Sequence, residues 1–339
     1  MSKRASLLVV VLFAWAAAAQ AAKYAGEFLE IGVGARGVGM GGAMAAHTDD
    51  PMSFYWNPAG MAYLTGPYAS GMYADLWDGL ANYSVAGLAL PVSGAVFSVN
   101  YVRLGVPNIE EHPDYALAEN RVINGDTLSV QEYLLATGAD PRGVFGANES
   151  ALFFTFAKLN RLTLDFGWSY FGLPIDLPIG ANLKIISQSM KGATGSGIGA
   201  DFGAQIRLRL SDLIWEKWKA SFAWGFNWQD VTRTAVDWGQ NNQDAIPPNF
   251  RQGFAFTQRL PGRDSRLIVS YDGEKRWDYT HHLGAEYRFE NVLALRGGYW
   301  GGEWTAGAGV AVWRATVDYA YLSRELGATH RLSVSLKLR

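Results

Sequence analysis

The sequence predicts an all-β fold, namely a closed antiparallel transmembrane β-barrel of about fourteen strands. Three observations favour it. Apolar and polar residues alternate along segments of about ten residues, short turns separate many of these segments, and the polar face carries charges. After residue 21 there is no uncharged apolar run of about 18 residues that could form a membrane helix. A soluble sandwich is the alternative, because it would bury the same apolar faces in a core.

The alternation is clearest in the C-terminal segment 281–339. There Leu283 and Ala285 fall on one face of a predicted strand, and His282 and Glu286 fall on the other. Side chains on a strand point alternately to opposite faces. We therefore expect the apolar faces to contact lipid and the charged faces to line the interior of a barrel.

The composition agrees with a barrel and excludes several classes of function. The chain has 339 residues, with 39 glycines, 14% aromatic residues and a formal net charge of −2. This near-neutral balance gives no reason to expect a nucleic-acid partner. The absence of cysteine excludes disulfides, thiolate metal sites and cysteine nucleophiles.

The first residues have the features of a secretory signal. Lys3 and Arg4 precede an apolar stretch from Leu7 to Ala19, and Ala19-Gln20-Ala21 provides the small residues of a cleavage site. We expect a signal peptide over 1–21. An exported chain with alternating strands and no membrane helix indicates the outer membrane, whose lipid is then an expected partner.

The segment 22–65 does not alternate and is rich in glycine. Gly32-Val-Gly34-Ala-Arg-Gly37 matches the dinucleotide pattern GxGxxG, but that motif requires a βαβ unit and no parallel α/β pattern follows. Glycines that let backbones approach closely are the better interpretation. Asp49-Asp50-Pro51 is expected to start a helix and Asn57-Pro58 to end it. The barrel is expected to occupy 66–339.

Two motifs carry a family resemblance. The first is GARGVGMGGA, from Gly34 to Ala43, followed by a DD pair and YWNPAG. With the C-terminal run from His281, it resembles the FadL-like outer-membrane proteins, and within them the PorV/PorQ branch. In that family the segment is an N-terminal hatch, or plug, inside the barrel. The candidate hatch-motif residues are Gly34, Arg36, Gly39, Gly41, Gly42, Asp49, Asp50, Trp56, Asn57, Pro58 and Gly60.

The resemblance implies two different roles. FadL-like proteins pass or bind hydrophobic small molecules, such as long-chain fatty acids, across the outer membrane through a plugged barrel. Proteins of the PorV-like branch serve type IX secretion and bind the C-terminal signal domains of exported proteins. The resemblance implies no cofactor for either role.

A long polar loop is predicted from Val106 to Asn148, with a short helix at Leu128–Ala136, and a second one from Asp230 to Pro248. Loops of this length usually carry function, and in barrels of this kind the long loops face the outside. The resemblance implies an apolar groove with a polar anchor. The candidates are Tyr115, Leu117, Leu134 and Leu135 for the groove and Arg121 or Arg142 for the anchor, with a solvated loop as the alternative.

The stretch from Ala151 to Phe171 allows two interpretations. It is either one long strand that extends beyond the bilayer or a hairpin that turns at Asn160-Arg161. A hairpin would change the strand count from 14 to 16, since a closed single-chain barrel has an even number of strands.

Catalysis is not expected. The histidines, His47, His112, His281, His282 and His330, show no metal-binding spacing, and no GxSxG motif occurs. The charges expected on the lumenal face are better interpreted as paired ions across a wet interior than as an acid–base site. They are Asp201, Glu286, Asp318, Arg207, Arg288 and Arg296.

Overall fold

The computed structural model describes residues 26–111, 121–137, 142–165, 167, 172–212, 219–239, 242–261, 264–324 and 327–338. The predicted signal peptide, Tyr115 and Leu117 lie outside these ranges. None of the helices within them is long and apolar enough to cross a membrane.

Within the described residues, fourteen strands form one closed antiparallel sheet, which confirms the predicted barrel. They are β1 (Tyr68–Leu76), β2 (Ala81–Val92), β3 (Ala95–Glu111), β6 (Gly143–Asp165), β7 (Gly172–Met190), β8 (Ala193–Arg209), β9 (Ala220–Gln229), β12 (Asn249–Leu260), β13 (Ser265–Lys275), β14 (Tyr279–Phe289), β15 (Leu293–Trp300), β16 (Glu303–Val312), β17 (Ala315–Arg324) and β18 (Gly327–Lys337).

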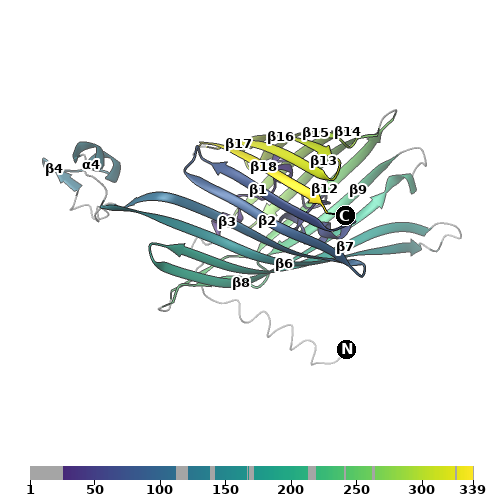
Figure 1. The fold of residues 1–339 in the computed structure, drawn as a ribbon, viewed down its shortest axis with the longest axis horizontal. Helices are drawn as coiled ribbons and strands as arrows, with labels where there is room; N and C mark the ends of the chain where they lie inside the picture. The colour runs from purple at the N-terminus through teal and green to yellow at the C-terminus, as the bar shows by residue number, and fades with distance from the viewer. Residues whose placement is uncertain are drawn as a thin grey trace, which may run out of the picture.

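Each barrel strand pairs with its neighbours in the chain, and β1 pairs with β18 to close the ring, with Tyr68 opposite Lys337 (Figure 1). We call the end of the barrel that carries Tyr68 and Lys337 the terminal end. The opposite end is called the loop end, because it carries the β3–β6 connection with α4 (Val130–Thr137). A two-stranded ribbon, β4 (Val122–Ile123) and β5 (Asp126–Thr127), belongs to the same connection.

The two faces of the sheet differ as the alternation predicts. On β14, Leu283 is 48% exposed, whereas its neighbours His282 and Glu286 on the inner face are fully buried. The same pattern on β18 exposes Leu332 and buries Arg331. An apolar exterior of this kind is the surface that a membrane-spanning barrel presents to lipid.

Strands β6 and β7 resolve the ambiguous stretch. β6 is a single strand of 23 residues that pairs with β7 from Ala147 to Asp165, with Asn160 opposite Leu177, so there is no hairpin at Asn160-Arg161. On its other side, β6 pairs with β3 only as far as Lys158, which is opposite Ala95. The residues of β6 beyond Lys158 and their partners on β7 therefore project past the rim at the terminal end (Figure 1).

The predicted loop from Val106 to Asn148 is wrong at both ends. β3 continues to Glu111 and β6 begins at Gly143, because these polar ends pair with each other across an irregularity between Val106 and Ile109. The short helix inside the loop is confirmed as α4. Ser129 and Glu132 exchange hydrogen bonds at its start, which is the pattern of a capping box.

The second predicted loop is also more ordered than expected. It contains β10 (Ala235–Asp237) and β11 (Gln243–Ala245), and β10 adds to β8 at the loop end. Inside the barrel, buried Lys184 forms ion pairs of 2.7 Å with Asp201 and 2.8 Å with Asp230. Because Asp230 begins this loop, the ion pairs tie the loop to the barrel wall.

Candidate functional site

The residues from 26 to 64, called the hatch segment, lie inside the barrel. They form η1 (Glu27–Leu29), α2 (Ala35–Gly39), α3 (Ser53–Trp56) and η2 (Pro58–Tyr63). The helix expected at Asp49-Asp50-Pro51 begins later, at Ser53. Asp50 instead accepts a hydrogen bond of 2.8 Å from the Met52 amide in the preceding turn. The predicted end at Asn57 is confirmed, since α3 stops at Trp56.

Hydrogen bonds join the hatch segment to strands all round the wall. Wall side chains supply most of the partners, so irregular backbone that would otherwise be unsatisfied is paired. Asp272 of β13 accepts from the amides of Met44 and Ala45 at 2.8 and 2.7 Å. Further wall donors or acceptors are Asn182, Asn227, Ser270, Thr305, Arg331 and Ser333.

Two glycines show how closely the hatch segment approaches the wall. Gly41 has φ +62°, and a Cβ there would lie 2.4 Å from the Leu283 carbonyl oxygen. Facing it on β15, a Cβ on Gly298 would lie 2.2 Å from the amide nitrogen of Gly41. Backbone meets backbone here, and only glycine leaves enough room.

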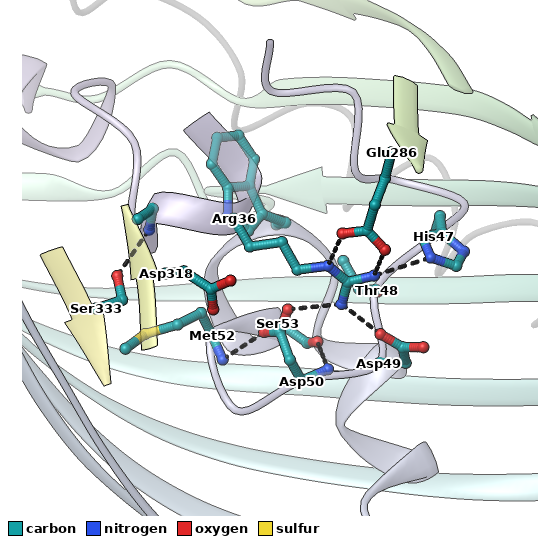
Figure 2. Close-up of polar contacts among 12 residues, drawn as sticks. Arg36, His47, Thr48, Asp49, Asp50, Met52, Ser53, Glu286, Asp318 and Ser333 are labelled. Carbon is teal, nitrogen blue, oxygen red and sulfur yellow. Dashed lines mark hydrogen bonds and ion pairs between the residues drawn. The ribbon is translucent and has the colours of Figure 1, made fainter. Parts of the chain in front are cut away.

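Arg36 is the centre of the polar contacts of the hatch segment (Figure 2). Its Nε donates to Glu286 of β14 at 3.0 Å, and its Nη1 donates to Asp49 and Asp50. Although Arg36 is only 7% exposed, three carboxylates compensate its charge. One guanidinium therefore joins two parts of the hatch segment to the barrel wall.

His47 completes this group. Its Nε2 lies 3.0 Å from Nη2 of Arg36. Burial lowers the pKa of His47 to about 3. The ring is thus neutral at pH 7 and Nε2 can accept a hydrogen bond from the guanidinium.

The Glu286 carboxylate, which pairs with Arg36, also belongs to an ion network on the barrel wall. Glu286 also pairs with Arg288 at 3.0 Å and with Arg296 at 2.6 Å, and Arg296 pairs with Asp318 at 2.7 Å. These residues were expected to be paired lumenal ions, and they form such pairs. They also contact the hatch segment, so the pairs are mostly buried rather than spread across open water.

A cavity of about 210 Å³ lies between the hatch segment and the wall at the loop end. We call it the loop-end cavity. Its apolar lining comes from Leu29, Tyr55, Trp277 and Trp300, and its polar lining includes Arg251, Arg276, Glu30, Glu274, Gln229 and Asn249. Aromatic surface and charged groups thus share one cavity.

A second cavity, of about 190 Å³, lies at the terminal end and is called the terminal-end cavity. The hatch residues Arg36, Asp49 and Asp50 line it together with Arg288 and Asp318 of the wall. Its lining also contains Tyr68 and Ser335, which lie close to the two ends of the barrel chain.

Buried aromatic rings lie between the two cavities. Trp56 of the hatch segment packs edge to face against Trp300 of β15, with centroids 5.6 Å apart, and His282 packs on Trp300 at the same distance. Arg251 lies over Trp56, and Trp56 Nε1 donates to the Val33 carbonyl at 2.7 Å. Trp300 lines the loop-end cavity, and Trp56 extends this aromatic layer to Gly37, next to Arg36 of the terminal-end cavity.

The sequence-predicted hatch residues come together in this region. Gly34, Arg36, Asp49 and Asp50 line the terminal-end cavity, and Trp56 belongs to the aromatic layer. The remaining hatch candidates are buried against the wall or against each other. They are Gly39, Gly41, Gly42, Asn57, Pro58 and Gly60.

The ligand-loop candidates that the structure describes are not brought to either cavity. Leu134 and Leu135 lie on α4, which projects from the loop end, and Leu135 is 79% exposed (Figure 1). Arg121 donates to the Leu128 carbonyl within the same connection, and Arg142 is exposed. Among the described candidates of this loop, no common groove forms.

Sequence reasoning missed Arg251, Glu274 and Asp272, which face the hatch segment and line its cavity or bind its backbone. The available signal was the alternation of polar and apolar residues, because each of the three falls on the polar face of a strand whose other face is apolar. In the part of the chain that the structure describes, no group of three His, Asp or Glu residues is placed to hold a metal ion.

The fold and the hatch segment define a plugged transmembrane β-barrel. No family model matches the chain, and no curated protein matches it. The PorV/PorQ branch and the secretion role that it implies therefore stay predictions from the sequence.

Three solved structures are similar to the chain. The chain is similar to the TodX monoaromatic hydrocarbon channel, with 10% identity and a TM-score of 0.48 over 89% of this chain and 96% of that chain. It is also similar to a Pseudomonas aeruginosa FadL homologue, with 11% identity and a TM-score of 0.46 over 91% and 98%. A third is the CymD monoaromatic hydrocarbon channel, with 11% identity and a TM-score of 0.39 over 90% and 96%.

Proposed function

We propose that this protein is an outer-membrane channel for small hydrophobic molecules that carry a polar group. The observation that carries the proposal is the pair of cavities on opposite sides of the hatch segment, with the aromatic layer of Trp56 and Trp300 between them. A molecule that enters from the loop end would reach the terminal end only after the hatch segment shifts.

The lining of the loop-end cavity supports this class of ligand. Trp277, Trp300 and Leu29 offer apolar surface for a ring or an alkyl chain. Arg251 and Arg276 offer donors for a carboxylate or hydroxyl group. Two of the similar solved structures, TodX and CymD, are monoaromatic hydrocarbon channels, and monoaromatic hydrocarbons are ligands of the same apolar kind.

Uptake measurements test the proposal. We expect cells that express the protein to take up a labelled long-chain fatty acid faster than cells without the gene. Trp277→Ala removes apolar lining at the cavity mouth without touching an ion pair of the hatch segment. Losing such a contact should weaken the apparent affinity about tenfold.

The matched control is Trp313→Ala, since Trp313 is 88% exposed on the turn between β16 and β17 at the opposite end. It should leave uptake unchanged. Equal uptake with and without the gene would remove the transport proposal, and equal losses in the two tryptophan variants would remove the loop-end cavity from it.

A further inference from the structure

Four cations lie side by side on the inner face of the barrel at the terminal end, and only one of them, Arg288, also lines the terminal-end cavity. Arg259 of β12 is directly opposite Arg266 of β13, and Arg266 is directly opposite Arg288 of β14. On the other side, the Arg259 amide donates to the Lys219 carbonyl at 2.9 Å. We call these four residues the cation row.

The register places the cation row on the lumenal face. Arg266 lies an even number of positions from Ile268, Ser270 and Asp272, which are buried on the inner face of β13. Arg288 lies two positions from buried Glu286 on β14, so both arginines are on the inner face. Neighbouring strands lie about 4.8 Å apart, so the row extends over roughly 14 Å. A row of this length can contact more than one anionic group of the same ligand.

Like charges at directly opposite positions destabilise a sheet unless something compensates them. Glu286 pairs with Arg288, but it also serves Arg36 and Arg296. The Nε atoms of Arg266 and Arg288 are buried and have no hydrogen-bond partner among the residues that the structure describes. Donors in such a state are suited to an acceptor that comes from a ligand.

A cavity of about 270 Å³ opens beside the row. Lys219 and Arg259 line it, and Arg209 of β8 adds a third cation. Hydroxyl groups of Ser211, Ser221 and Thr257 complete the polar lining, and no carboxylate occurs among the described residues that form it. Guanidinium forks together with hydroxyl donors are the groups that bind phosphate and carboxylate oxygens.

We propose that the cation row and this cavity bind a small anion with two or more oxyanion groups, phosphate or carboxylate. The site lies at the terminal-end mouth of the barrel, where Lys219 and Arg259 are exposed. The proposal depends on the register of β12, β13 and β14 and not on the transport of hydrophobic molecules.

Calorimetric titration of the purified full-length protein in detergent tests the site, at about 0.15 M salt to screen weak surface attraction. The probes are tripolyphosphate and citrate, with chloride as the monovalent reference. We expect saturable binding of tripolyphosphate or citrate, and the tighter of the two identifies the oxyanion class. Arg259→Gln and Arg266→Gln should each weaken it about tenfold.

Arg314→Gln is the matched control. It removes the same charge at the same end, but Arg314 lies over Trp313 on the exposed turn between β16 and β17. Absence of binding to both probes would overturn the proposal. An equal loss of affinity in Arg314→Gln would also overturn it, because it would show attraction to overall charge only.

Thermal unfolding gives an independent readout. Because like charges repel across β12 and β13, Arg266→Gln should raise the unfolding temperature without ligand and reduce the stabilisation by tripolyphosphate. If Arg266→Gln does not fold, Arg259→Gln decides the question, since its side chain is exposed and its loss leaves no buried group unpaired. Undiminished stabilisation by tripolyphosphate in Arg259→Gln would contradict the proposal.

Discussion

Replacing Arg36 with methionine is expected to open the barrel to ions while leaving the wall intact. The change removes the buried guanidinium that joins Glu286 of the wall to Asp49 and Asp50 of the hatch segment. Breaking a buried ion pair from one side costs about 3–5 kcal/mol, because the remaining charges lose their partner. In planar lipid bilayers, we expect the variant to conduct in frequent, large steps that are rare for the unchanged protein.

Two further variants sharpen this test. Arg161→Met removes an arginine of the same size from an ion pair with Asp176 in which Arg161 is 79% exposed, and a pair of that kind contributes little. Its conductance should match the unchanged protein. Arg36→Lys keeps the charge but cannot reach three carboxylates with one nitrogen, so an intermediate conductance is expected. A folded Arg36→Met variant with unchanged conductance would refute the role of Arg36 as an anchor.

The second large effect, faster cleavage by trypsin and a lower unfolding temperature, is expected from Gly298→Ala. The added methyl group would meet the backbone of Gly41 at 2.2 Å, and no rotamer change can move a backbone atom away. Either the hatch segment or β15 must shift, at a cost of about 1–3 kcal/mol. Arg36 is the only Lys or Arg between residues 26 and 64, so trypsin cleavage after Arg36 reports when the hatch segment leaves the barrel.

Gly297→Ala is the control one residue away on the same strand. Gly297 faces outward and a Cβ there meets nothing within 4 Å. We expect its cleavage rate and unfolding temperature to stay close to those of the unchanged protein, since exposed substitutions usually change stability by less than about 0.5 kcal/mol. Equal cleavage of the two alanine variants would contradict the close packing at Gly41.

The alternation of side chains made the barrel and the lumenal face predictable. Glu286, Arg296 and Asp318 were placed correctly on the inner face, because a period of two residues assigns a face to each position of a strand. The hatch segment was recognisable because Gly34 to Gly42 contains many glycines and no alternation. These are local properties, which a single sequence records.

The partners of those residues were not predictable in the same way. Nothing near Asp272 in the sequence indicates that its carboxylate accepts hydrogen bonds from Met44 and Ala45, which precede it by more than two hundred residues. The ends of β3 and β6 were missed for another reason. Beyond the lipid a strand needs no apolar face, so paired polar residues such as Glu110 and Glu111 have the composition of a loop.

The bonds between the hatch segment and the final strand have a consequence for assembly. Arg331 donates to the Ile31 carbonyl across 300 residues of chain, and Ser333 accepts from the Ala35 amide across 298. Contacts of such high sequence separation require a large loss of chain entropy before they form, and proteins that depend on them fold slowly. We therefore expect the hatch segment to take its place only when β18 joins the sheet, so that the interior packs and the barrel closes in the same late step of folding.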